Sequence, residues 1–324
     1  MLRFKIFEMS DKLPINKFEK ERMIKQLLKR AKREERTMRA ATGVSIRQFT
    51  ELSLFFHAVL ISKANKKNRK RVVGGGRKGI LRGVEEKVFF ILFYLKVYPT
   101  YDLASMLFQA DRSQPCRWVK VYFPILEAAL GRTLSLPKRK VSSMEEFQEV
   151  FRNVYDVLVD VTERKCQRPS SSKNLKRRYS GKKKSHTRKN TLMVDEGKQI
   201  RFISPTRNGR IHDFKLFKKE GIAHCLPKGY SLWVDKGYTG IDSLLPDHTK
   251  AYIPKKKSKN TPLTPLEKSD NKAISSLRMP VEHAIGGMKR YGCMQTPIRN
   301  KRWDIEDKMP LLCAGLWNFH LDRR

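Results

Sequence analysis

Three carboxylates stand out along a strongly basic chain. Asp160 lies near the end of a β-branched stretch, VYDVLVDV, and Asp235 follows a second short apolar stretch just before a glycine turn. Glu282 is the only acidic residue between Asp270 and Asp304, in a segment that is otherwise rich in lysine and arginine. In sheets flanked by helices, functional side chains collect at the carboxyl ends of strands. We therefore expect these three side chains to meet in one site.

The chemistry of such a site depends on what neutralises it. Carboxylates that share a site repel one another and lose hydration, so each of them needs a positive partner. Separate lysine partners are one arrangement open to a basic chain. The other is a hard divalent cation, because Mg²⁺ prefers oxygen ligands and completes its shell with substrate phosphate. Two such ions about 4 Å apart activate the attacking oxygen and stabilise the leaving oxygen in phosphoryl transfer.

The charge balance indicates a polyanionic partner. Of the 324 residues, 70 are Lys or Arg and 32 are Asp or Glu, which gives a formal net charge of +38. Hydrophobic residues make up 40% of the chain, enough to build cores, so this is not a disordered basic tail. Nucleic acid is the first candidate for the partner. A ribosomal protein and a membrane-surface protein are the alternatives that charge alone leaves open.

Cysteine usage and hydropathy favour the interior of a cell. The five cysteines are scattered and include no CxxC pair, which suits neither a disulfide framework nor a zinc knuckle. The longest apolar run, VFFILFYL, is too short to span a bilayer, and the N-terminus lacks the apolar core of a signal peptide. We expect no membrane partner, and a cytoplasmic protein associated with the nucleoid, or a nuclear one if the source is eukaryotic.

The front of the chain is predicted to be helical. Residues 1–79 have the pattern of basic helices that end in a linker, KANKKNRKRVVGGGRKG. Residues 80–135 have the pattern of three helices in the order of a helix-turn-helix, a DNA-binding motif whose last helix enters the major groove. That last helix is basic at its start, so base reading is assigned to Arg112, Gln114 and Arg117.

The pattern changes over residues 144–324, which form the third predicted domain. Strand, hairpin around Gly197, helix, strand, helix or turn, strand, long helix and final helix follow one another. This order predicts an α/β fold, a mixed sheet flanked by helices. Thr100, Ser113 and Thr264 have the residue type and position of helix N-caps in the two folded regions.

A strongly basic segment leaves the strand that bears Asp160. Residues 164–189 hold twelve Lys and Arg and no acid. A disordered surface loop is one interpretation. We favour a loop that grips DNA at the site, with Lys182, Lys183 and Lys184 on phosphates, because phosphate contacts supply affinity without sequence preference.

Five short sequence motifs, taken in order, resemble one family. VDVTERKCQRP, YSGKKKSHTRK, NGRIHD, WVDKGYTG and NKAISSLRMPVEHAIGGMKRYG resemble the DDE transposases of bacterial insertion sequences, in the group numbered five, to which Harbinger-type transposases are related. The likeness runs from about residue 42 to the C-terminus. It implies a ribonuclease H-like catalytic core behind an all-helical helix-turn-helix region, and use of divalent metal.

Matched position by position, the resemblance assigns roles. Asp160, Asp235 and Glu282 match the family's catalytic, metal-binding carboxylates. Arg278 and Lys289 match the arginine and lysine around that glutamate, which are implied to contact DNA near the cleaved end. On an ideal helix, steps of four and eleven residues return close to the starting direction. Arg278, Glu282 and Lys289 would therefore share one face of the helix.

Neighbouring residues leave alternatives. Asp156 lies on the same side of its strand as Asp160, but the D-x-T-E pattern favours Asp160. Pro280 falls inside the helix that carries the third carboxylate, so it is expected to bend that helix or to mark its start. The pair His212–Asp213 could orient water or pair with the site, although a structural place at the start of a helix is favoured.

The implied function is that of a transposase. It would cut at the terminal inverted repeats of its own insertion sequence and join the 3′ ends to target DNA by metal-dependent phosphoryl transfer. Mg²⁺, with Mn²⁺ as a substitute, is the expected cofactor, at two ions. Double-stranded DNA is the expected partner, together with a second copy of the chain in a homodimer. The alternatives are a catalytically inactive, transposase-derived DNA-binding protein and a structural RNA-binding protein; three intact carboxylates favour the enzyme.

Overall fold

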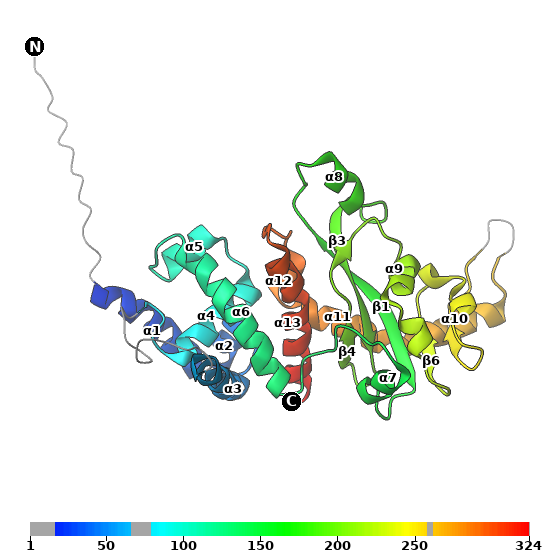
Figure 1. Cartoon of the computed structure of the whole chain (residues 1–324), viewed down its shortest axis with the longest axis horizontal. Helices are drawn as coiled ribbons and strands as arrows, with labels where there is room; N and C mark the ends of the chain where they lie inside the picture. Colours follow the sequence, from blue (N-terminus) through cyan, green and yellow to red (C-terminus); the bar gives the residue numbers. More distant parts are fainter. Residues whose placement is uncertain (1–16, 66–78, 258–261, 324) are drawn as a thin grey trace, which may run out of the picture.

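The computed structural model describes residues 17–65, 79–257 and 262–323, which form a helical region and a mixed sheet with helices around it. Helix α13 (Trp303–Leu321) lies between the helical region and the sheet (Figure 1). The front region is built from six helices: α1 (Lys17–Arg33), α2 (Glu35–Thr42), α3 (Ile46–Asn65), α4 (Val84–Val97), α5 (Tyr101–Leu107) and α6 (Gln114–Arg132).

Helices α4, α5 and α6 are the three helices expected in residues 80–135. Thr100 caps α5 as predicted, since its hydroxyl accepts a hydrogen bond from the Leu103 amide at 3.1 Å. The predicted Ser113 cap is wrong in its mechanism. Ser113 precedes α6 in a helical conformation, with φ −76° and ψ −20°, and its hydroxyl donates to Asp111 instead. An N-cap needs an extended backbone to aim its oxygen at the first free amides, and Ser113 does not adopt one.

Within the described residues the sheet has seven strands in the order β2-β3-β1-β6-β7, with β4 and β5 also paired to β3. Strand β1 is central: it pairs with β3 antiparallel and with β6 parallel, and β6 pairs with β7 parallel. This confirms the predicted mixed α/β class. The strands are β1 (Asp156–Lys165), β2 (Tyr179–Ser180), β3 (Ser185–Val194), β4 (Ile200–Ile203), β5 (Arg207–Asn208), β6 (Ser231–Trp233) and β7 (Lys250–Tyr252).

The segment 164–189, predicted to be a loop, is a loop only in part. Strand β1 continues to Lys165, β3 already starts at Ser185, and helix α8 (Ser172–Arg178) and β2 lie between them. Arginines enter the strands because distant acids neutralise them: Arg188 is 5% exposed and forms an ion pair with Glu306 of α13. The density of positive charge gave no sign in the sequence that these two strands extend into the segment.

Side-chain alternation on β1 separates two cores. Val157 and Val159 belong to the apolar cluster with α7 and α9, whereas Leu158 belongs to the cluster with α11 and α13. Successive side chains of a strand point to opposite faces, so Asp160 falls on the Leu158 side, toward α11. The helices around the sheet are α7 (Met144–Val150), α8, α9 (Asp213–Glu220), α10 (Pro265–Leu277), α11 (Met279–Lys289), α12 (Gly292–Gln295) and α13.

The front helical region and the region around the sheet share one core. The larger apolar cluster takes buried side chains from α1–α4, α6, α11, α12, α13 and the sheet, and the partly buried Tyr101 of α5 packs against it. Helices α11 and α13 approach closely, since a Cβ placed on Gly287 would lie 2.1 Å from the Trp317 ring. The predicted domain boundaries at 79/80 and near 135–144 remain predictions. Side chains from both sides of the second boundary belong to the same apolar cluster.

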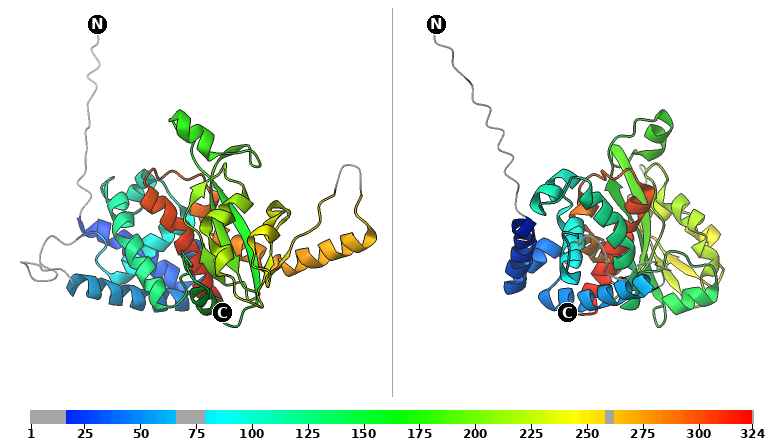
Figure 2. Two further views of the ribbon diagram at one scale, coloured as in Figure 1. Left: turned by 45° about the vertical axis from the view of Figure 1, so that its right-hand side comes forward. Right: turned by 60° about the vertical axis from the view of Figure 1, so that its left-hand side comes forward.

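Helix α10 projects from the body, and none of its residues is buried (Figure 2). The predicted Thr264 cap is confirmed as a capping box with Glu267. The chain breaks at Arg278, and Pro280 then occupies the first turn of α11. Pro280 thus marks the start of the helix that carries Glu282. Proline has no backbone N–H to donate, and the N–H groups of a first helical turn have no partner within the helix, so proline is tolerated there.

Among the residues that the structure describes, no single helix combines the length and apolarity needed to cross a membrane; α2 and α3 together reach that length and composition across a bend of 53°.

Candidate active site

One cavity gathers the three predicted carboxylates. Its volume is 450 Å³, and its walls include Asp160 from β1, Asp235 after β6 and Glu282 from α11. The predicted phosphate contacts Arg278 and Lys289 line the same cavity, as do Lys182 and Lys183. Lys184 is exposed but does not line it. Residues up to 129 positions apart in the sequence thus meet, because β1 and the end of β6 face α11.

Both aspartates are oriented by the backbone that follows them. The Asp160 carboxylate accepts a hydrogen bond from the Val161 amide at 2.7 Å, and the Asp235 carboxylate accepts one from the Lys236 amide at 2.7 Å. Hydrogen bonds to a carboxylate favour its charged form. In Asp160 the other carboxylate oxygen faces Arg278, whereas in Asp235 the same oxygen accepts from the Lys236 amide and lies nearest Arg278.

Arg278 connects the two aspartates. One guanidinium nitrogen lies 3.4 Å from an Asp160 oxygen, and the other lies 3.8 Å from an Asp235 oxygen. The Arg278 side chain is only 8% exposed, and within the described residues its Nε has no hydrogen-bond partner. Its position follows from the break between α10 and α11, where Arg278 ends one helix and precedes the next.

The site is rich in negative charge at its base. Burial raises the pKa of Asp160, and the nearby carboxylates Asp235 and Asp213 act in the same direction, against the Val161 amide and Arg278. Like charges disfavour each other's ionised form, and an opposite charge favours it. The pKa of Asp160 is therefore raised mainly by burial, and the Val161 amide and the charge of Arg278 offset only part of that rise.

The donors fit a divalent cation by their chemistry. All are carboxylate oxygens, which Mg²⁺ and Mn²⁺ prefer, and Asp160 and Asp235 already share one positive group. In the described part of the chain, however, no three His, Cys, Asp or Glu side chains stand close enough together to hold an ion. The guanidinium of Arg278 occupies the space between the aspartates, so an ion bound by both of them would have to displace it.

Two further carboxylates, Glu163 and Asp213, line the cavity, and for Asp213 a place at the site is the less favoured of the two alternatives in the sequence. Asp213, at the start of α9, lines the cavity and is 2.9 Å from Lys189 of β3. The sequence favoured a purely structural place for it, and the position at a helix start is confirmed. The motif NGRIHD, which lies between the motifs that contain Asp160 and Asp235, is the sequence signal that could have placed Asp213 at the site.

Tyr238 forms the floor beneath these acids. Its side chain is 1% exposed, and burial, together with the charges of Asp213 and Asp160, raises its pKa well above the ordinary range. Its hydroxyl has no hydrogen-bond partner among the described residues. Tyr238 therefore stays protonated and packs η2 (Lys236–Tyr238) against the sheet.

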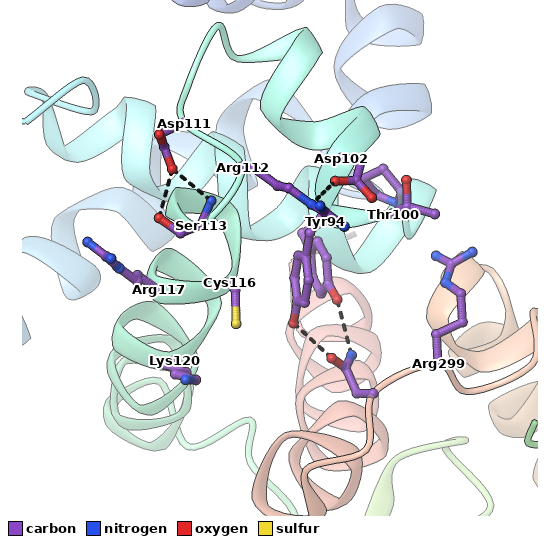
Figure 3. A pocket seen from close by; sticks show the side chains of 13 residues that line it. Tyr94, Thr100, Asp102, Asp111, Arg112, Ser113, Cys116, Arg117, Lys120 and Arg299 are labelled. Atoms are coloured by element: carbon purple, nitrogen blue, oxygen red, sulfur yellow. Dashed lines mark hydrogen bonds and ion pairs between the residues drawn. The ribbon is translucent and has the colours of Figure 1, made fainter. Parts of the chain in front are cut away.

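The three residues assigned to base reading lie elsewhere. Arg112 and Arg117 line a separate cavity of 640 Å³ at the start of α6, together with Lys120 and Arg299 (Figure 3). Arg112 is paired with Asp102 at 2.6 Å but remains 84% exposed. Gln114 is half-buried and does not line this cavity.

Comparisons with known proteins identify the family. Residues 159–318, which include all three carboxylates, match a family described as DDE superfamily endonuclease. The chain is also 30% identical over 288 residues to a protein of Microchaete diplosiphon called "Probable transposase for insertion sequence element IS702". That match covers 87% of this chain and 97% of the relative. No solved structure matches. A nearly full-length match to that relative, together with a nuclease-family match over the carboxylate site, places this chain among the DDE transposases of insertion sequences.

Proposed function

We propose that the chain cuts DNA at the terminal inverted repeats of its own element and joins the freed 3′ ends to target DNA, on a ribonuclease H-like catalytic core. The observation that carries this proposal is the single cavity that Asp160, Asp235 and Glu282 line together with basic residues. The mixed sheet supports it as well, because Asp160 lies on the central strand and Asp235 follows the neighbouring parallel strand.

The reaction proceeds in two phosphoryl transfers. Water attacks the phosphodiester at the end of the element, the bond to the 3′ oxygen breaks, and a 3′-hydroxyl remains. That hydroxyl then attacks a phosphodiester of the target and displaces its 3′ oxygen. No covalent bond between protein and DNA forms, so neither step needs a serine or tyrosine nucleophile.

The chain's own residues divide the work by charge. Asp160, Asp235 and Glu282 are the proposed ligands of Mg²⁺ or Mn²⁺, at two ions, which when bound would activate the attacking oxygen and stabilise the leaving one. Arg278 and Lys289 face the same cavity and would hold the phosphate near the cleaved end. Charge-assisted hydrogen bonds from arginine to phosphate are strong and orient the group.

Recognition of the ends is assigned to the helix-turn-helix region. Arg117 and Lys120 project from the start of α6, and Arg112 precedes it. Gln114, half-buried beside them, is retained as a base contact in the proposal. Two ends must be held at once for both to join one target, so the proposed active form is a homodimer.

A nicking assay on the element's own ends tests the proposal. DNA that flanks the gene is incubated with the full chain and Mg²⁺ or Mn²⁺, and strand breaks are mapped. Changing Asp160→Asn, Asp235→Asn or Glu282→Gln should each lower cleavage at least roughly a hundredfold, because several kcal/mol of transition-state stabilisation depend on these groups. Asp156→Asn is the matched control: it changes the same strand, but Asp156 accepts a hydrogen bond from Trp233 and lies outside the cavity.

Two results would contradict the proposal. Cleavage that survives any one of the three substitutions would remove that residue from the catalytic set. Specific binding of the terminal DNA with no cleavage by the unaltered chain, in either metal, would favour the inactive DNA-binding protein.

A further inference from the structure

A second and larger cavity opens beside the active site. This groove has a volume of 1690 Å³ and shares two lining residues, Lys182 and Asp213, with the catalytic cavity. Helix α8 and the β2–β3 turn form one wall, and the segment from β5 into α9 forms the other. Figure 1 places α8 and α9 at different heights beside β3. A ligand in the groove would therefore lead directly to the catalytic carboxylates.

The charged side chains that line the groove are positive with one exception. Eight of its residues are Lys or Arg and only Asp213 is acidic: Arg168, Lys176, Arg177, Lys182, Lys189, Arg210, Lys215 and Lys219. Within the described part of the chain, the only ion pair made by any of these cations is that of Lys189 with Asp213. Cations gathered in a concave surface attract a polyanion far more strongly than cations scattered over a convex one.

The two walls are tied together at one end. The Gly209 amide donates to Thr187 at 3.0 Å, and the Arg210 amide donates to Arg177 at 3.3 Å. A Cβ on Gly209 would lie 1.9 Å from the Thr187 hydroxyl, so only glycine allows this approach. The groove is therefore formed in the free protein, and a ligand does not have to organise it.

An aromatic pair lies among these cations. Tyr179 of β2 is 43% exposed, and its ring contacts the His186 ring edge to face, with centroids 5.7 Å apart. Both residues line the groove and pair in register across β2 and β3. Grooves that combine cations with exposed rings bind unpaired nucleic acid, because bases stack on the rings while the cations follow the backbone.

We propose that this groove holds an unpaired DNA strand that leaves the active site, and that Tyr179, supported by His186, stacks one of its bases. The inference rests on the proposed function for the place where the strand is cut. It extends to α9 a role in binding the substrate that the sequence indicates only for residues 164–189, the segment that contains α8. In duplex DNA the bases are stacked on each other and cannot reach a ring, so the groove should distinguish forked from blunt DNA.

Binding measurements without divalent ions test this strand groove separately from cleavage. Fluorescence anisotropy compares a fork, meaning a duplex with one unpaired arm, with a blunt duplex of the same terminal sequence. The double variant Lys215→Glu, Lys219→Glu should bind the fork at least roughly tenfold more weakly. The slope of log affinity against log salt should fall by about 1.4, which corresponds to two lost phosphate contacts on a single strand. Binding to the blunt duplex should change much less.

The matched control carries the same charge change. Lys218 is exposed on α9 and Lys173 is exposed on α8, and neither lines the groove. The double variant Lys218→Glu, Lys173→Glu should therefore bind the fork nearly as well as the unaltered chain. Equal losses in the two double variants, or equal losses for fork and blunt duplex, would overturn the proposal.

The stacking role has its own pair of variants. Tyr179→Ala should weaken fork binding roughly tenfold and Tyr179→Phe should restore it, because stacking depends on the ring and not on the hydroxyl. A Phe variant as weak as the Ala variant would overturn the stacking role. Since these measurements contain no divalent ion, weakened fork binding supports the groove even if cleavage is never observed, and cleavage with unaltered fork binding supports the proposed function without the groove.

Discussion

Arg278 is expected to compete with divalent metal in the free protein. Its guanidinium lies 3.4 Å from Asp160 and 3.8 Å from Asp235, the two aspartates proposed as metal ligands. An ion and a guanidinium cannot both occupy the space between them. Changing Arg278→Gln removes the positive charge and leaves a shorter polar side chain, so the aspartates become available to the ion.

The size of the effect follows from the distances. A unit charge at 3.4 Å interacts by about 5 kcal/mol at an effective dielectric constant of 20 and by about 1 kcal/mol in bulk water. The side chains of Asp160 and Asp235 are 27% and 42% exposed, so solvent screening brings each pair toward the lower figure. A gain of about 1.4 kcal/mol in metal binding corresponds to a tenfold change. We therefore expect Arg278→Gln to bind Mn²⁺ roughly tenfold more tightly in the absence of DNA.

The assay measures binding and needs no substrate. Electron paramagnetic resonance of free Mn²⁺ gives the dissociation constant for the unaltered chain, for Arg278→Gln and for Arg290→Gln. Arg290 is exposed at the end of α11 and lies outside the catalytic cavity, so it matches the loss of net charge alone. Tighter binding in the Arg278 variant only would support the competition. Unchanged or weaker binding in that variant would refute it and would mean that Arg278 holds the aspartates in place for the metal.

Two further predictions concern stability. Gly287→Ala should lower the free energy of unfolding by roughly 2 kcal/mol, because the new Cβ would lie 2.1 Å from Trp317; Gly286→Ala, where nothing lies within 4 Å, should be neutral or slightly stabilising in denaturant titrations. Asp307→Asn should cost about 1–2 kcal/mol at pH 7: burial tends to raise the pKa of Asp307, but the charge of Arg139 and a backbone amide outweigh it, so the pKa is lowered. That contribution is present above the pKa of the unfolded chain, near 3.8, and is lost as the pH falls through the folded value. The stabilities of the variant and the unaltered chain should therefore stay apart down to about pH 3.8 and converge only at lower pH, and a constant gap would contradict the assignment.

The parts of the fold that the sequence predicted depend on local signals. Thr100 and Thr264 start helices because their hydroxyls accept amides three residues ahead. Asp235 could be placed just after a strand because a short apolar stretch precedes it and a glycine turn follows it. The expectation that Asp160 lies near the end of its strand is wrong, since β1 continues for five residues beyond it to Lys165. Pro280 could be read as a helix start because its ring excludes a helix interior. Each of these inferences uses residues within about one turn or one strand of the feature.

The parts that the sequence did not predict depend on distant partners. Strand β3 begins at Ser185 because Arg188 finds Glu306, which lies 118 positions away in the chain. Asp213 reaches the active site because Lys189 crosses from β3 to bind it. A run of positive charge has the same local pattern whether it is solvated or neutralised, so neither contact could be inferred from composition or spacing.

The shared core sets the distance between the proposed sites of DNA recognition and DNA cleavage. Helix α6, which carries Arg117, packs on α13, and α13 packs on α11, which carries Glu282. Apolar side chains from all three helices belong to one cluster. Closely packed interiors deform little, so a recognition helix and a catalytic cavity joined in this way keep a fixed separation. If α6 reads the terminal repeat, the position of the cut relative to the recognised bases is then set by side-chain packing along α13. Inserting base pairs between the recognised sequence and the cleaved end should abolish cutting at that end, because the chain cannot stretch to follow it.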